Sequence, residues 1–306
     1  MKNSLLYPVS TSSRRTVSLD GMWKFQFDPE SVGSASGWTN GLPSPVFMPV
    51  PSSFCDLFTD KDSREYCGDF WYETDFFVPG EWEGQDVTIR FGSATHRARV
   101  FVNGVEAAYH EGGFLPFNAE IAALVNYNQY NKLTVLVNNE LNEAMLPAGT
   151  VTTLSNGKKM AVPYFDFYNY SGLQRPVKLL CLPKEQIVDF TVNHHLNGRD
   201  ADVEYTVETN GSHNCIVEVY DKEGIKVAES VGKKGNLHIE NVHLWDVHKS
   251  YLYHFVIRIM DNENVLDEYF EKIGVRVFEI KDGKFLLNGK SVYLKGFGKH
   301  EDSDLR

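Results

Sequence analysis

The sequence has almost no helical periodicity and no long apolar run. Its apolar residues alternate with polar ones instead of recurring every three and four positions, which excludes a helical bundle. No stretch approaches the roughly 20 consecutive apolar residues that a membrane-spanning helix needs. The first ten residues contain a single lysine and only a broken apolar run, so we expect no signal peptide. We therefore expect a mainly β protein that binds no membrane.

Clustered positive charge is also missing. The chain of 306 residues contains 30 lysines and arginines against 41 acidic residues, a formal net charge of -11. The nearest basic runs, Arg14-Arg15 and Lys233-Lys234, are too short to follow a phosphate backbone. We therefore expect no nucleic-acid partner.

Cysteines are few and scattered. They stand at positions 55, 67, 181 and 215, with no CxxC spacing. Cys55 and Cys67 could form a disulfide, but four cysteines in so long a chain are more typical of the free thiols of a cytoplasmic protein. We expect free thiols and a cytoplasmic location.

Motifs for metals and cofactors are also lacking. His194 and His195 are adjacent, and neighbours on a strand point to opposite faces, so they are poorly placed to bind one ion. No glycine-rich run has the strand–loop–helix setting of a phosphate-binding loop. We expect neither a metal nor a cofactor.

Short strands separated by turn residues fill the first part of the chain. Asn103-Gly104 suits the positive φ angles of a tight hairpin. The alternating segments are Thr16–Phe27, Phe70–Val78, Val87–Phe91, Arg99–Asn103 and Lys132–Asn138. Many short strands with regular turns are typical of sandwiches and barrels. We predict one large, jelly-roll-like β-sandwich over residues 1–183.

A second series of strands follows the seam at Pro183–Glu185. The segments are Ile187–His194, Ala201–Glu208, Cys215–Tyr220, Ile225–Ala228, Asn236–Ile239, Leu252–Met260 and Leu266–Ile273. Polar tips at 221–224 and 261–264 separate some of them. Seven short strands in about ninety residues predict an immunoglobulin-like sandwich over residues 184–277.

The last segment, residues 278–306, changes character. Phe278–Ile280 and Lys284–Leu287 predict a small hairpin, and Asn288-Gly289 leads into a further strand. That strand, from Ser291 to Leu294, has the composition of a buried strand. Gly296 and Gly298 then break it before a charged loop. Chemistry in barrels and open α/β sheets sits at such strand ends.

Several longer motifs are too specific to follow from composition. The first sandwich contains Leu19–Phe25, Phe70–Pro79, Val102–Gly104, Gly112–Phe117 and Asp166–Val177; the second contains Leu244-Trp245, Tyr251–Tyr253 and Ile273–Arg276; the last segment contains Lys295–Asp302. In this order they resemble the sugar-binding, immunoglobulin-like and catalytic domains of glycoside hydrolase family 2. The resemblance implies that residues 278–306 begin a (β/α)₈ barrel that is truncated at the end of this chain.

Two further segments indicate a subgroup of that family. Val137–Asn142 and Gly296–Arg306 are most similar to its β-glucuronidases. The resemblance implies hydrolysis of β-D-glucuronides, as small molecules or glycans, with retention of configuration and without a cofactor. It also implies a cytoplasmic homo-oligomer, a tetramer in this family.

Retaining hydrolysis needs two facing carboxyl groups about 5–5.5 Å apart. The resemblance implies that both are glutamates well inside the barrel, one of them after an asparagine. The Asn-Glu pairs at 139–140, 142–143 and 262–263 lie in the sandwiches and are interpreted as solvated turns. We therefore expect no catalytic residue in this chain and no activity of these 306 residues alone.

Two residues are candidates for substrate binding. Asp166 lies in an aromatic run, where a carboxylate is costly to bury without hydrogen bonds, and the resemblance implies that it reaches the sugar hydroxyls. The alternative is an aspartate that caps a turn. His300 follows the barrel strand and could contact the sugar or leaving group; it could equally bond Glu301 and only shape the loop.

Two other functions stay open at this point. A sister enzyme of the same family would act on β-galactosides or β-mannosides, and a panel of aryl glycosides would distinguish it. A non-catalytic carbohydrate-binding or interaction protein would consist of the two sandwiches alone. The barrel-like segment after Val277 speaks against that second alternative.

Overall fold

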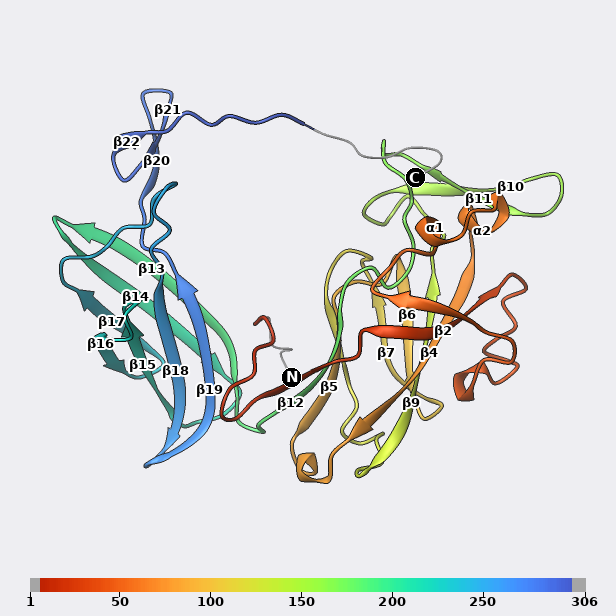
Figure 1. Ribbon diagram of the computed structural model, residues 1–306, viewed down its shortest axis with the longest axis horizontal. Coiled ribbons are helices and arrows are strands. Elements are labelled where there is room, and N and C mark those ends of the chain that lie inside the picture. Colours follow the sequence, from red (N-terminus) through yellow and green to blue (C-terminus); the bar gives the residue numbers. More distant parts are fainter. Residues whose placement is uncertain (1–5, 299–306) are drawn as a thin grey trace. The chain divides into compact units, whose positions relative to one another are not determined.

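The computed structural model describes residues 6–298 and is mainly β, as predicted. It divides into two compact units, which are described separately (Figure 1). The first unit comprises residues 16–181, and the second comprises residues 6–15 together with 182–298. The segment 6–15 thus packs with strands that follow it by more than 170 residues in the sequence.

The first unit is a sandwich of two sheets. One sheet has six strands in the order β3 (Val46–Val50), β2 (Gly21–Asp28), β4 (Asp69–Val78), β9 (Gln129–Asn138), β6 (Arg97–Val102) and β7 (Val105–Glu111). The other has the order β1 (Arg15–Ser18), β12 (Val177–Leu182), β5 (Asp86–Phe91) and β8 (Phe117–Glu120). The predicted hairpin at Asn103-Gly104 joins β6 to β7, and φ is positive at both residues, at 51° and 82°. The prediction of a β-sandwich is confirmed.

Alternate side chains of these strands build the core between the sheets. Phe25 on β2 and Phe70 and Tyr72 on β4 are at most 1% exposed, and they meet Ile89 and Phe91 of the opposite sheet in one cluster. Because side chains in a strand alternate between faces, every second residue of β2 and β4 points inward. Phe70 and Tyr72 are therefore core residues.

The outer face of the six-stranded sheet is covered by the loop 29–45, which contains η1 (Trp38–Asn40). Two buried carboxylates hold this loop. Asp28 accepts hydrogen bonds from the backbone N–H of Gly33 and from the indole of Trp71. Glu73 accepts one from the N–H of Leu42 at 2.7 Å. Trp71, Phe101 and Leu42 are thereby buried outside the main core.

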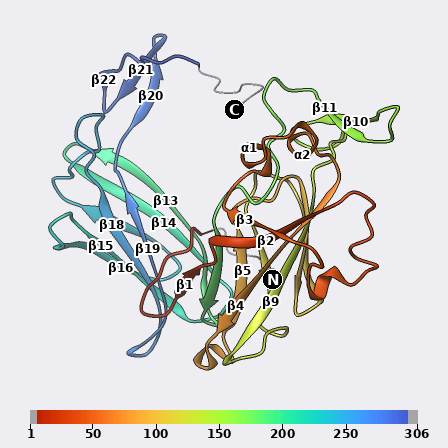
Figure 2. The ribbon, with the colours of Figure 1, turned by 45° about the vertical axis from the view of Figure 1, so that its right-hand side comes forward.

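Two short helices and a hairpin lie together at one end of the first unit (Figure 2). The helices are α1 (Phe54–Leu57) and α2 (Lys61–Arg64), and the hairpin consists of β10 (Gly149–Thr153) and β11 (Lys159–Pro163). Asp60 caps α2 by accepting the N–H of Ser63. The chain between β11 and β12 begins beside these elements.

The second unit is the predicted seven-stranded immunoglobulin-like sandwich. One sheet has the order β13 (Ile187–Asn197), β14 (Asp200–Thr209) and β17 (Lys234–Ile239). The other has the order β16 (Lys226–Val231), β15 (Asn214–Tyr220), β18 (Tyr253–Asp261) and β19 (Asn264–Ile273). Both predicted polar tips, 221–224 and 261–264, connect antiparallel neighbours.

A buried ion pair joins the N-terminal segment to this second sandwich. Arg14 is 3% and Asp267 0% exposed, and the Arg14 guanidinium donates to both carboxylate oxygens of Asp267. Asp267 also accepts the N–H of Ile187, while Arg14 donates to the carbonyl of Ile187. Ser13 donates a further hydrogen bond to Asp267. Every buried charge in this cluster therefore has a partner.

The last described segment is a small three-stranded sheet of β20 (Phe278–Lys281), β21 (Lys284–Leu287) and β22 (Lys290–Ser291). The expected hairpin is present. The expected buried strand over Ser291–Leu294 is not, because β22 ends at Ser291 and Tyr293 and Leu294 are 83% and 63% exposed. No described segment covers these two side chains, so their apolar pattern alone does not make a strand.

The four cysteines are free and buried, as predicted. Burial raises the pKa of the Cys215 thiol to about 11 and that of Cys67 also to about 11. Within residues 6–298, no helix is long and apolar enough to cross a membrane.

Candidate functional site

Asp166 lies in the loop that follows β11. Its side chain is exposed, and the neighbouring Tyr164 and Phe167 are 61% and 41% exposed. Among the described residues, none forms a hydrogen bond or ion pair with the Asp166 carboxylate. A turn-capping aspartate would accept a nearby backbone N–H, and residues 6–298 provide no such bond. The carboxylate is thus available to accept hydrogen bonds from a ligand.

Buried hydrogen bonds fix the end of this loop around Ser171, which we call its foot. Ser53 and Ser171 bond each other twice: the Ser53 hydroxyl donates to the Ser171 carbonyl, and the Ser171 N–H donates to the Ser53 hydroxyl, at 3.0 and 3.1 Å. The side chain of Asn139 donates to the Ser171 hydroxyl and to the carbonyl of Tyr66. Both serines and Asn139 are buried. The loop therefore has a fixed base and an exposed tip.

A buried histidine supports the same loop. His96, between β5 and β6, is 1% exposed, and its Nε2 lies 2.6 Å from Oδ1 of Asn169. Burial lowers the pKa of His96, although the bond to Asn169 acts in the opposite direction. No signal in the sequence marks this pair, because the two residues are 73 positions apart and neither belongs to a catalytic motif.

A cavity of about 550 Å³ adjoins Asp166. It is lined by residues of α2, β11 and the loop itself, among them Lys61, Arg64, Pro163, Phe167 and Tyr168. The guanidinium of Arg64 stacks over the ring of Tyr168 and also donates to the carbonyl of Cys55. The lining thus combines two carboxylates, Glu65 and Asp166, with two cations and aromatic surfaces, and such a mixture suits a polyhydroxylated ligand.

The glutamates of the three Asn-Glu pairs have ordinary structural surroundings. Glu140 forms an ion pair with Lys159, and Glu143 accepts a hydrogen bond from the hydroxyl of Tyr164 at 3.1 Å. Glu263 is exposed in the turn between β18 and β19.

The remaining sequence candidates are His300 and the adjacent pair His194 and His195. His300 lies outside residues 6–298. His194, partly buried on β13, contacts the backbone of Arg276, and its neighbour His195 is exposed. Within the described residues, no group of three or more histidine, cysteine or acidic side chains is arranged to hold a metal ion.

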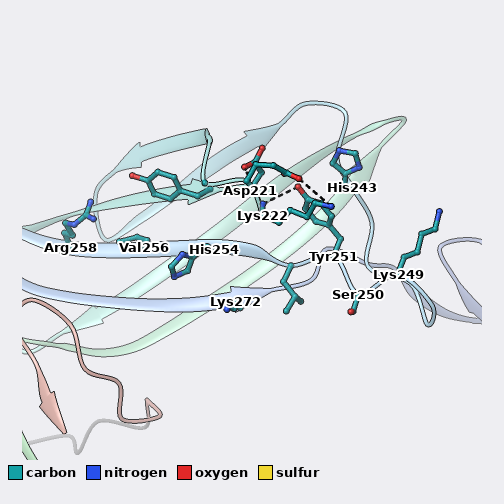
Figure 3. Close-up of a pocket in the computed structure, with 14 residues that line it drawn as sticks. Asp221, Lys222, His243, Lys249, Ser250, Tyr251, His254, Val256, Arg258 and Lys272 are labelled. Carbon is teal, nitrogen blue, oxygen red and sulfur yellow. Dashed lines mark hydrogen bonds and ion pairs between the residues drawn. The ribbon is translucent and has the colours of Figure 1, made fainter.

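A larger cavity of about 1010 Å³ lies on the second unit (Figure 3). Its wall includes Tyr251, whose ring lies 4.8 Å from that of His243 and under the ammonium of Lys222. Arg258 is already paired with Glu268 at 2.7 Å. Lys222 and Arg258 thus already have partners, and we assign this cavity no ligand.

Comparison with known families follows the order of the two units and the last segment. Residues 16–183 match the sugar-binding domain of glycosyl hydrolases family 2, residues 180–276 match a second model of glycosyl hydrolases family 2, and residues 278–306 match the TIM barrel domain of that family. The chain belongs to glycosyl hydrolases family 2. The resemblance inferred from the motifs is thus confirmed.

Individual relatives narrow the comparison to one kind of enzyme. The chain is 37% identical over 310 residues to β-glucuronidase of Paenibacillus borealis and 35% identical over 338 residues to that of Homo sapiens. The alignments cover 99% and 100% of this chain, but 52% of each relative. The crystal structure of Ruminococcus gnavus β-glucuronidase is similar with a TM-score of 0.96 and 55% identity, over 100% of this chain and 52% of that one. The chain spans about half the length of the relatives it matches.

Proposed function

We propose that the complete protein is a retaining β-glucuronidase and that this chain supplies its sugar-binding and immunoglobulin-like parts. The relatives named above support the activity. One relative of known structure, the Ruminococcus gnavus enzyme at 55% identity, has been solved in complex with D-glucuronic acid. The observation on this chain that carries the proposal is the exposed Asp166 carboxylate, which has no partner among residues 6–298 and lies in a loop with a fixed base.

Asp166 accepts hydrogen bonds from hydroxyl groups of the glucuronide in this proposal. Bonds to a charged acceptor are shorter and stronger than neutral ones. His300 contributes a second contact to the sugar or the leaving group. The acid/base and the nucleophile, two glutamates about 5–5.5 Å apart in a retaining enzyme, come from the part of the complete protein outside these 306 residues.

Further parts of the proposal concern organisation and location. We propose domains at 1–183, 184–277 and 278–306, the last as the start of the catalytic barrel, and a cytoplasmic homotetramer. Four free, buried thiols support a reducing compartment. Sedimentation of the complete protein tests the tetramer, and a dimer or monomer would contradict it.

Substitution of Asp166 tests the central claim. In the complete protein, Asp166→Asn keeps the shape and removes the charge. Charge-assisted hydrogen bonds contribute about 1.5–3 kcal/mol, so kcat/KM for an aryl β-glucuronide should fall roughly 10- to 200-fold, with little change in melting temperature. As a matched control, Asp62→Asn removes an exposed carboxylate of α2 that pairs with Lys158, and kcat/KM should not change.

Two results would contradict the proposal. A complete protein that hydrolyses aryl β-galactosides or β-mannosides in preference to β-glucuronides would identify a different glycosidase of the family. An Asp166→Asn variant that loses several degrees of melting temperature but keeps normal turnover would make Asp166 a structural residue.

A further inference from the structure

His96 is a buried polar residue directly behind the loop of Asp166, and the proposed reaction does not use it. Its ring lies between Asn169 on one side and the segment Gly113-Phe114 on the other. Nε2 lies 2.6 Å from Asn169 Oδ1, and the ring meets that of Phe114 edge-on at 5.9 Å. A buried imidazole needs a reason, because an apolar side chain of similar size would be cheaper to bury.

The hydrogen bonds of Asn169 determine which nitrogen of His96 carries the proton. The Asn169 side-chain nitrogen donates to the carbonyl of Asn139 at 3.3 Å. A carbonyl can only accept, so the amide oxygen of Asn169 must face His96. Nε2 of His96 is therefore the donor. The neutral ring then carries a lone pair on Nδ1.

Nδ1 is sealed from solvent and has no hydrogen-bond partner within residues 6–298. A Cβ atom added to Gly113 would lie 2.9 Å from Nδ1, so the backbone of this glycine closes that side of the ring. A second proton would place an unpaired donor there, in a buried environment and near the Arg97 charge. This agrees with the lowered pKa of His96. The ring is thus held neutral with one functional donor, Nε2–H.

That donor acts on the residue from which the Asp166 loop turns back into the sandwich. Asn169 lies three residues after Asp166, and its own carbonyl accepts the hydroxyl of Ser171. Its side chain links His96 to the buried Asn139. Without the His96 donor, the amide oxygen of Asn169 would be left without a partner, and this end of the loop would lose one of its fixed points.

We propose that His96 is a positioning residue for substrate binding, which acts by holding Asn169 so that the loop presents Asp166 to the sugar. This inference rests on the proposed function, because it takes Asp166 as the substrate contact. His96 itself touches no substrate. Sites whose supporting residues are fixed in this way bind more tightly, since a misplacement of about 1 Å is enough to weaken the contact.

A double-mutant cycle in the complete protein tests the inference. His96→Leu fills the site of the ring with an apolar side chain and removes the donor, so kcat/KM for an aryl β-glucuronide should fall about 10-fold, mainly through a higher KM. In the Asp166→Asn background the same substitution should change kcat/KM less than 2-fold, because the contact that His96 positions is already weakened.

Two amide variants distinguish the loss of the His96 hydrogen bond from a general loss of folding. The amide nitrogen of His96→Gln reaches the position of Nε2, so this variant should recover most of the wild-type KM. The amide of His96→Asn reaches only the position of Nδ1, so its KM should stay as high as that of His96→Leu. A general packing defect would not separate these two variants in this order.

His254→Leu is a matched control in the second unit. The Nε2 atom of His254 is also buried and has no hydrogen-bond partner among the described residues, and the variant should leave kcat/KM unchanged.

The outcomes separate the two proposals. If Asp166→Asn alone has no effect, the proposed role of Asp166 fails and the inference fails with it. If Asp166→Asn lowers kcat/KM but His96→Leu lowers it equally in both backgrounds, the proposed function stands and the positioning role of His96 is overturned. Equal KM values for His96→Gln and His96→Asn would also overturn it.

Discussion

The ion pair of Arg14 and Asp267 should be a large single contribution to the stability of the second unit. Both side chains are almost completely buried, and the carboxylate of Asp267 also accepts hydrogen bonds from Ser13 and from the backbone of Ile187. Asp267→Asn keeps the shape but offers one acceptor oxygen and one donor group. In the variant, the amide NH₂ group must then face N–H groups of Arg14 or Ile187, which in the wild type donate to the carboxylate.

The expected loss follows from the charge that stays behind. Removing one partner of a buried ion pair costs about 3–5 kcal/mol, because the other charge is left buried without compensation. For a domain of this size, 1 kcal/mol corresponds to a change of roughly 3–6 °C in melting temperature. Asp267→Asn should therefore lower the transition of the second unit by roughly 10–30 °C.

Differential scanning calorimetry measures this shift, and hydrogen exchange of β18 and β19 peptides assigns it to the second unit. A control is Asp202→Asn, which changes an exposed carboxylate of β14 that bonds His238 and should move the transition little, because exposed pairs are screened. The double variant Arg14→Met with Asp267→Leu removes both charges. Its loss of unfolding free energy should be smaller than the sum of the losses in the single variants Arg14→Met and Asp267→Leu. A shift of only a few degrees for Asp267→Asn, or additive single changes, would refute the reasoning.

Three further predictions concern the first unit and the last segment. Burial would raise the pKa of Glu73, but hydrogen bonds from Lys132, Lys24 and the backbone of Leu42 outweigh it and lower this pKa. The ionised Glu73 therefore stabilises the fold above the unfolded pKa of about 4.5, and this stabilisation is lost as the pH falls through the folded pKa. In Glu73→Gln, the free energy of unfolding should therefore depend less on pH in that acidic range. In Gly33→Ala, the new Cβ would lie 2.6 Å from the Trp71 indole nitrogen, so the melting temperature should fall; an unchanged value would contradict the packing of loop 29–45. Amides of 292–298 should exchange much faster than those of β4, which is paired on both sides, and equal protection would count against this difference.

The strands could be predicted because the pattern that specifies a strand lies within a few consecutive residues. In β14 the buried residues Val203, Tyr205 and Val207 alternate with more exposed ones, which marks a strand with one face in the core. The turns between strands were equally readable, as at Asn103-Gly104 with its two positive φ angles. The prediction of a strand over Ser291–Leu294, made from its apolar composition, was wrong beyond Ser291, because such a composition specifies a strand only where a neighbour pairs with it and covers it.

What the sequence did not predict depends on distant partners. Asp28 and Glu73 are ordinary acidic residues in the sequence, and only the folded sheet shows that they hold the loop 29–45 over Trp71. Arg14 is separated from Asp267 by 253 positions, and no pattern in either segment connects them. Asp166 could be found as a candidate because a carboxylate in an aromatic run is unusual in itself.

The proposed role of Asp166 gives the sandwich domain a sugar contact whose position is fixed by buried residues. A carboxylate at a loop tip gains little by being exposed unless its position is fixed, since a mobile loop loses conformational entropy when a ligand orders it. Here Ser53, His96 and Asn139 come from three separate segments and are all buried, and each contacts the foot of the loop. The entropy of ordering this foot is therefore lost during folding and not during binding. It follows that substitutions at these buried residues should weaken the proposed binding of substrate through the position of Asp166.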